Sequence, residues 1–301
     1  MNWGWRFCRP LPYHLAMPPF CGEGSYLKGR TMNYQPSPHS EELKMAKKVQ
    51  EGLLSVESPD IPGVLIAKRY LAADSVGGDF YTFVSKQHHA MTSKSKMRGV
   101  VEYRDTRENQ LGVIIGDVAG HGVSSALVMA LSSGLLSEIA KQCKTPSETL
   151  IKANQALLKY IETSQIRYVT VFYLSVLIQS KTVVWAKAGH PDVLLIKKEG
   201  GVSFLEAEGV VLGMYDQETY QDFSCTIDAG DRLFLYTDGL TERRNPDGEE
   251  FGIERLRAFC QETVNLPIET VLDQLIQRLD LFSNHQPLRD DQTMVLIELE
   301  G

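Results

Sequence analysis

The sequence has no uninterrupted run of 18 apolar residues, which is about the length that a membrane-spanning helix needs. Its five cysteines form no C-x-x-C pair, so neither a zinc site nor a disulfide framework is indicated. Positive charge is also scarce: 31 Lys and Arg against 38 Asp and Glu give a formal net charge of -7, which argues against nucleic acid as the main partner. Prolines at positions 10, 12, 18 and 19 interrupt any signal-peptide core. We therefore expect a cytoplasmic protein with neither nucleic acid nor membrane among its partners.

Three segments differ in character along the chain. Residues 1–38 form an irregular leader of unknown function, residues 39–57 have the pattern of an amphipathic linker helix, and residues 58–301 are expected to form one catalytic domain. The helix either packs on its own domain or pairs with a second copy to give a homodimer through residues 41–54, and two heptads do not decide between these. Its apolar face is expected to contain Leu43, Ala46, Val49, Gln50, Leu53 and Leu54.

The order of the predicted elements indicates the fold class. Short apolar strands come first, two helices follow near 123–141 and 146–162, strands resume, and two late helices near 253–262 and 267–282 precede a last strand. This order lacks the alternating strand–helix rhythm of a parallel sheet. It predicts an α+β protein in which antiparallel sheets are layered with helices.

Four strand-like segments carry an aspartate where the strand meets its turn. "SVGGDFY" places Asp79 at a strand start, "VIIGDV" and "LFLYTDGL" place Asp117 and Asp238 at strand ends, and "RDDQTMVLIEL" places Asp290 and Asp291 before the last strand. Any one of them could be an ordinary turn or cap residue. Bare carboxylates beside buried strands are costly, however, and no lysine or arginine adjoins the first three. The set together predicts a cation-binding site.

Oxygen ligands without sulfur favour Mg²⁺ or Mn²⁺ over zinc. Four aspartates are enough for two ions roughly 3.5–4 Å apart, a spacing that lets a shared water be deprotonated and directed at phosphorus. The helix that begins at Val123 adds free backbone N–H groups near the same place. The residues therefore predict a two-metal centre that hydrolyses a phosphate ester.

The motifs "SVGGDFY", "GDVAGHGVSSALVMA", "AGHPDVLLI", "LYTDGLTERRNPDGEEFG" and "DDQT", in this order, resemble a branch of the metal-dependent protein phosphatase 2C superfamily. It is the bacterial branch of stage-II-sporulation-E proteins and sigma-factor regulators, and the resemblance covers about residues 41–299. It implies a four-layer α-β-β-α sandwich of two antiparallel sheets flanked by helices, with two Mn²⁺ or Mg²⁺ ions at one edge. It also implies hydrolysis of phosphoserine or phosphothreonine on a regulatory protein, such as an anti-sigma-factor antagonist.

The resemblance further implies roles for single residues. Asp117 would bridge both ions, Asp238 would hold the same cluster, and these two acids would be central to catalysis. Asp79 would bind directly or through water. The implied metal ligands are Asp79, Asp117, the backbone carbonyl of Val118, Asp238 and Asp290, with Asp291 as the alternative to Asp290.

Two histidines adjoin these motifs. In the superfamily a histidine two residues after the bridging aspartate protonates the leaving group, whereas His121 follows Asp117 by four residues. His121 is therefore either a general acid or a turn residue at the start of the helix. We expect His190, in "AGHPD", to be a hydrogen-bonding turn residue rather than a ligand.

One segment departs from the resemblance. The stretch from Ser85 to Val101 is basic, contains no acid and is longer than the hairpin loop usual in the family. It is either a solvated loop or a flap that recognises an acidic partner through Lys94, Lys96 and Arg98. For the whole chain we expect a metal-dependent serine/threonine protein phosphatase. The alternative is a non-catalytic phosphatase-like scaffold that binds a signalling partner.

Overall fold

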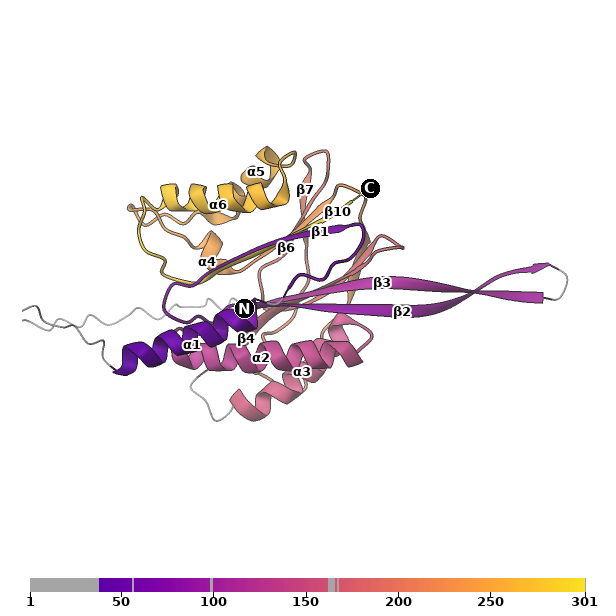
Figure 1. Cartoon of the computed structure of the whole chain (residues 1–301), viewed down its shortest axis with the longest axis horizontal. Helices are drawn as coiled ribbons and strands as arrows, with labels where there is room; N and C mark the ends of the chain where they lie inside the picture. The colour runs from indigo at the N-terminus through magenta and orange to yellow at the C-terminus, as the bar shows by residue number, and fades with distance from the viewer. Residues whose placement is uncertain (1–37, 56, 98–99, 162–165, 167, 301) are drawn as a thin grey trace, which may run out of the picture. The chain divides into compact units, whose positions relative to one another are not determined.

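The computed structural model describes residues 38–55, 57–97, 100–161, 166 and 168–300, with the backbone alone for 38–40 and 87–108 (Figure 1). The expected leader thus lies almost wholly outside the described residues. Ten strands in the described part form two five-stranded sheets, and every pairing between neighbouring strands is antiparallel. One sheet has the order β1 (Val64–Leu71), β10 (Gln292–Leu299), β9 (Arg232–Tyr236), β6 (Val193–Ile196), β7 (Val202–Leu205). The other has the order β2 (Phe80–Met97), β3 (Val100–Val118), β4 (Val169–Leu177), β5 (Thr182–Ala188), β8 (Phe223–Thr226).

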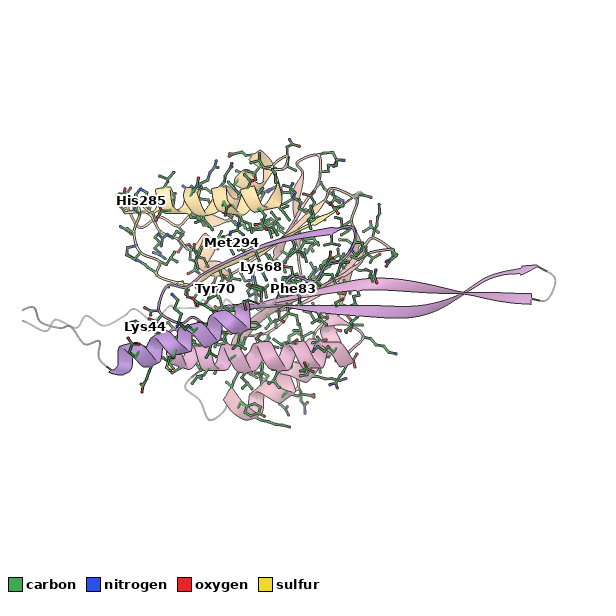
Figure 2. The ribbon with its side chains drawn as sticks, in the orientation of Figure 1. Lys44, Lys68, Tyr70, Phe83, His285 and Met294 are labelled. Carbon is green, nitrogen blue, oxygen red and sulfur yellow. The ribbon has the colours of Figure 1, made fainter. Side chains whose placement is uncertain are left out.

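Helices cover the outer face of each sheet, and side chains fill the layers between them (Figures 1 and 2). Helices α2 (Val123–Gln142) and α3 (Pro146–Ile161) pack on the β2–β5 sheet, while α5 (Gly252–Glu262) and α6 (Ile268–Phe282) pack on the β1–β7 sheet. One apolar cluster lies between the sheets and under α2 and α3, and a second lies under α5 and α6. Because both faces of the central strands are covered, they are apolar throughout: all of Val113, Ile114 and Ile115 are fully buried.

Helix α2 is the one described helix that is long and apolar enough to cross a bilayer, by length and composition alone. It packs against α3 and against strands β2 and β3, with Met129, Leu136 and Ala140 buried. An apolar helix is what this layer requires, because one side of α2 completes the core while α3 covers part of another.

Helix α1 (Pro38–Leu54) packs on α2 and β2 through a narrower face than the sequence pattern suggested. Gln50 and Leu54 are buried, whereas Val49 and Leu53, expected on the same face, are 65% and 45% exposed. With Met45, which is 61% exposed, these two residues form an apolar stripe at a spacing of four along the helix. Val49 and Leu53, expected on one face with Gln50 and Leu54, are therefore exposed, and pairing of this face with a second copy stays a prediction.

The segment expected to be a loop is a β-ribbon. Strands β2 and β3 pair continuously from Phe80↔Gly116 to Lys94↔Glu102, whereas β4 pairs with β3 only from Gln110 to Val118. The ribbon beyond Gln110 therefore has no third strand among the described residues and extends past the rest of its sheet (Figure 1). Its sequence lacks the apolar alternation by which a half-buried strand is recognised. That is why the pattern was misread as a loop.

Candidate metal centre

The two sheets bring four strand ends to one edge of the sandwich. In one sheet, Phe80 pairs with Gly116, so the start of β2 lies beside the end of β3, which carries Asp117. In the other, Met294 pairs with Tyr236, so the end of β9 lies beside the start of β10. Asp79 directly precedes β2, and Asp238 begins the short helix α4 (Asp238–Thr241) two residues after β9. In an antiparallel pair the start of one strand lies beside the end of its neighbour, so residues far apart in sequence become adjacent.

Two threonine hydroxyls join these edges across the gap between the sheets. Thr237 and Thr293 each donate a hydrogen bond to Oδ2 of Asp79, both at 2.7 Å. The hydroxyl oxygen of Thr237 in turn accepts a bond from the backbone N–H of Thr293 at 3.0 Å. One oxygen of the buried Asp79 carboxylate is therefore saturated with donors. Sequence reasoning missed both threonines, although each lies within three residues of a predicted acid.

The carboxylates of the site destabilise one another's charged forms. Burial, and then the charge of Asp117, raise the pKa of Asp79 well above its ordinary value. Burial, and then the charges of Asp238 and Asp290, raise the pKa of Asp117. Loss of solvent is also the main cause of the raised pKa of Asp238 and of Asp290. No lysine or arginine in the described part of the chain forms an ion pair with any of these acids. A bound cation would relieve this repulsion.

Gly78 leaves room for a ligand where two oxygens converge. A Cβ atom at this position would lie 2.9 Å from the carbonyl oxygen of Val118 and 3.4 Å from Oδ1 of Asp117. Gly239 is required for a different reason, because its Cβ would lie 2.1 Å from the carbonyl oxygen of Asp291. The glycines that precede Asp79 and follow Asp238 thus allow the backbone to approach the acids closely.

The adjacent acids before β10 have different environments. Asp291 is buried, and its two oxygens accept hydrogen bonds from the backbone N–H of Ala73 at 2.8 Å and of Gly78 at 2.7 Å. Asp290 lies at the rim and is more exposed than Asp291, and among the described residues its carboxylate accepts one hydrogen bond, from the backbone N–H of Asp291 at 2.9 Å. The first acid of the pair is therefore free to bind a ligand, while the second fastens the loops on either side of it.

The donor set fits a hard divalent cation. Every group at the edge is an oxygen, as Mg²⁺ and Mn²⁺ prefer. The hydroxyl of Tyr70, labelled in Figure 2, is buried without a hydrogen-bond partner among the described residues, and the charges of Asp291, Asp79 and Asp117 act on it. No three acidic, histidine or cysteine side chains of the described residues surround one point closely enough to form a complete cage. Water and the Val118 carbonyl would have to share the coordination, which is usual for Mg²⁺.

His190 connects the two halves of the site from inside the core. It is 3% exposed; its Nε2 lies 3.1 Å from the carbonyl oxygen of Tyr236, and its Nδ1 lies 2.9 Å from the hydroxyl of Thr170. Nε2 must donate to the carbonyl, so Nδ1 accepts from Thr170, which pairs with Asp117 across β3 and β4. Burial lowers the pKa of His190 to about 3, so the ring is neutral. The prediction that His190 is a hydrogen-bonding residue is confirmed.

We expect His190→Leu to lower the free energy of unfolding by about 2–4 kcal/mol, because the Thr170 hydroxyl and the Tyr236 carbonyl lose their partner in the core. The unfolded chain binds a proton on this histidine near pH 6.5 and the folded chain does not until about pH 3. The free energy of unfolding should therefore decrease by about 1.4 kcal/mol for each pH unit below about pH 6.5, because of His190. Urea unfolding at about pH 7.5 and 5.5 measures both effects. The exposed His285→Leu is the control, and equal pH slopes in wild type and His190→Leu would contradict the expectation.

The remaining predicted site residues lie in other environments. His121 is exposed, and its charge lowers the pKa of Asp290, which places it on the Asp290 side of the centre. Lys94 lies 14 residues beyond Phe80 in β2, about 46 Å along an extended strand. The structure therefore does not bring the backbone of Lys94 or Lys96 to the carboxylates. Arg98 lies outside the described residues.

The sequence did not reveal that Gln50 forms hydrogen bonds with Gly77. From α1 its side-chain amide donates to the carbonyl oxygen of Gly77 at 2.6 Å and accepts from the Gly77 N–H at 3.0 Å. A buried glutamine on an amphipathic helix is unusual and was the available signal. The helix is thereby attached to the loop that carries Gly78 and Asp79.

Comparison with known proteins identifies the family and the fold of this chain. Residues 107–300 match the family model described as Stage II sporulation protein E (SpoIIE). The phosphoserine phosphatase RsbU of Bacillus subtilis is 24% identical over 281 residues, which cover 91% of this chain and 74% of that protein. The SiaA-PP2C domain of Pseudomonas aeruginosa has a TM-score of 0.69 at 19% identity, covering 87% of this chain and 97% of that one. RsbX, solved in complex with magnesium, has a TM-score of 0.55 at 16% identity and covers 81% and 99%.

These structural neighbours confirm the expected fold, two antiparallel sheets flanked by helices. The family model covers more than half of the chain. This chain belongs to the stage II sporulation protein E (SpoIIE) family.

Proposed function

We propose that this protein is a Mn²⁺- or Mg²⁺-dependent serine/threonine protein phosphatase of bacterial signalling. One observation carries the proposal: carboxylates from four strand ends of two sheets meet at one edge, and no cation of the described residues pairs with them. The similarity to RsbU, a phosphoserine phosphatase, supports the same activity. The substrate is then a phosphoserine or phosphothreonine of a regulatory protein, such as an anti-sigma-factor antagonist, and the reaction takes place in the cytoplasm.

Asp117 is the proposed bridging ligand because the carboxylates of all the other predicted acids act on it, and the Val118 carbonyl lies beside it at Gly78. When bound, the two cations supply a water with a lowered pKa and neutralise charge on the phosphate. Asp79, held by its two threonine bonds, keeps one oxygen toward Asp117. Asp290 is favoured over Asp291 as a ligand because both oxygens of Asp291 already accept backbone hydrogen bonds.

The role of His121 at the mouth of the centre is also a proposal. Its exposure and its closeness to Asp290 fit a group that donates a proton to the departing seryl oxygen, or that orients water there. No hydrogen bond ties it to another described residue, so it is free to reach a substrate.

The helix of residues 41–54 is the proposed dimer contact. Met45, Val49 and Leu53 are exposed along one stripe, and an apolar stripe of this kind is a common interface between copies. Since Gln50 on the adjoining face holds Gly77, pairing of two such helices would act on the loop before Asp79.

The test is turnover of a phosphoserine peptide by purified protein with EDTA, and after addition of Mn²⁺ or Mg²⁺. We expect no activity in EDTA and full recovery with Mn²⁺, because the carboxylates alone repel a phosphate. A protein that binds Mn²⁺ by calorimetry yet hydrolyses neither the peptide nor a small aryl phosphate would be a scaffold rather than an enzyme. Activity that survives complete metal removal would overturn the metal-dependent proposal.

A further inference from the structure

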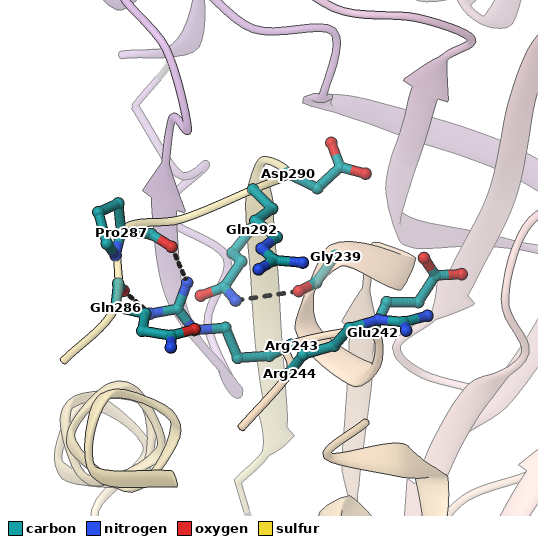
Figure 3. A pocket seen from close by; sticks show the side chains of 9 residues that line it. Gly239, Glu242, Arg243, Arg244, Gln286, Pro287, Asp290 and Gln292 are labelled. Carbon is teal, nitrogen blue, oxygen red and sulfur yellow. Dashed lines mark hydrogen bonds between the residues drawn. The ribbon is translucent and has the colours of Figure 1, made fainter. Parts of the chain in front are cut away.

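A cavity of about 240 Å³ lies directly beside the proposed metal centre (Figure 3). Two of its lining residues, Gly239 and Asp290, belong to the centre itself. Its other walls carry three arginines, Arg243, Arg244 and Arg289. The volume is below the roughly 300–1,000 Å³ of typical small-molecule sites. It suits a side chain of a protein substrate better than a nucleotide.

Arg243 forms a buried cationic wall of the cavity. It is 7% exposed, and its guanidinium donates to the carbonyl oxygen of Pro287 at 2.8 Å, to the hydroxyl of Ser283 at 2.7 Å and to the carbonyl oxygen of Gln286. Its Nε is buried with no hydrogen-bond partner among the described residues. All of its bonds go to neutral acceptors, so no carboxylate is in contact to neutralise its charge. Burial lowers its pKa, and Asp280 acts on it only through space.

Arg289 adds a second positive charge to the wall of the cavity. It forms no hydrogen bond or ion pair with the described residues, and its charge lowers the pKa of Arg243 further. Arg244 pairs with Glu250 on the surface, and two carboxylates also line the cavity: Glu242, beside Arg244, and Asp290, which is a proposed metal ligand. Two guanidinium groups that repel each other across a small cavity indicate a site for an anion.

We propose that this cavity binds a carboxylate side chain that flanks the phosphorylated residue of the substrate. The proposal rests on the proposed phosphatase function and specifies its substrate class as an acidic phosphopeptide segment. Arginine forks match carboxylates in two-point hydrogen bonds, and Arg289 directly precedes Asp290, so the acidic residue lies next to the phosphate. A protein of net charge -7 needs a local positive site to bind an acidic segment of a substrate.

The experiment compares two phosphoserine peptides on the Mn²⁺-loaded protein, one with glutamates and one with glutamines beside the phosphoserine. For wild type we expect a higher kcat/KM with the glutamate peptide. In Arg289→Gln the preference should fall about tenfold, mainly through KM, as for one lost charge-assisted hydrogen bond. Arg257→Gln on α5 is the matched control, because Arg257 has no described ion pair and does not line the cavity. A preference that is unchanged in Arg289→Gln, or equally reduced in Arg257→Gln, overturns the proposal.

Two further measurements separate this proposal from its premise and from its nearest rival. Binding of the unphosphorylated glutamate peptide, measured by calorimetry, needs no turnover. If neither phosphopeptide is hydrolysed, the proposed phosphatase function is wrong, and this binding measurement alone tests whether the cavity binds a carboxylate. The binding should be weakened about tenfold in Arg289→Gln and be absent for the glutamine peptide. Inorganic phosphate is the rival occupant. If Arg289→Gln weakens inhibition by phosphate but leaves the peptide preference intact, the cavity holds phosphate and the carboxylate proposal is wrong.

Discussion

Asparagine in place of Asp117 should leave a folded protein that turns over a phosphoserine peptide about a thousandfold more slowly, or worse. Asp117 lies one residue before the end of β3, and burial and the surrounding carboxylates raise its pKa. Asparagine has the same shape but neither the charge nor the second acceptor oxygen that a bridging ligand needs. Because the substitution removes like-charge repulsion, the metal-free variant should be at least as stable as wild type.

The measurement pairs steady-state kinetics with thermal unfolding, each with and without Mn²⁺. Wild type should gain stability with Mn²⁺, as a ligand that binds only the native state requires. The Asp117→Asn protein should gain little. Asp228→Asn, a carboxylate that is 84% exposed, is the control and should behave as wild type. If Asp117→Asn keeps more than a tenth of wild-type activity, the residue does not bridge the metals.

Asp290→Asn should lower turnover and leave stability nearly unchanged, whereas Asp291→Asn should mainly lower stability. Asp290 lies at the rim, and within the described part of the chain its carboxylate is bonded only to its neighbour's N–H, so its loss should reduce turnover by about a thousandfold and leave unfolding nearly unchanged. Asp291 receives the N–H groups of Ala73 and Gly78, one on each oxygen. Asparagine would turn an amide NH₂ toward one of these donors, so we expect unfolding to be about 2–4 kcal/mol easier.

Urea unfolding of the metal-free variants and calorimetry with Mn²⁺ distinguish the two acids. Asp290→Asn should keep the urea midpoint of wild type and lose at least one Mn²⁺ site. Asp291→Asn should shift the midpoint and, once folded, retain both sites. The reverse pattern would make Asp291 the ligand, and equal losses in both variants would mean that the pair acts as a unit.

The acids of the site could be found in the sequence because their signal is local. A β-branched run such as Val113–Ile115 predicts a buried strand, and a carboxylate at its end without an adjacent cation is conspicuous. The residues that support the acids have no such signal. Thr237 and Thr293 are ordinary strand-end threonines of one sheet, and their convergence on Asp79 of the other sheet joins positions that are 158 and 214 residues apart along the chain.

The ribbon of β2 and β3 shows where pattern reading fails. Its outer part is polar and charged, so it has neither the alternation of a half-buried strand nor the turn residues of a short loop. Residues of this part of β2 are paired with residues of β3, and this pairing is not visible in the sequence of either strand alone. The same limit applies to α1, where the sequence leaves open which apolar residues form the packed face. Only contact with α2 and β2 shows that Gln50 and Leu54 define it.

The residues alone were enough to predict the layered α+β fold and the four strand ends that carry an aspartate, because hydrophobic periodicity and the cost of a bare buried charge act within a few residues. Folding in three dimensions was needed to separate Asp290 from Asp291, to place His190 between Thr170 and Tyr236, and to form the arginine cavity beside the centre. These depend on distances between strands of different sheets. Such distances are set by how the two sheets pack, which no short stretch of sequence contains.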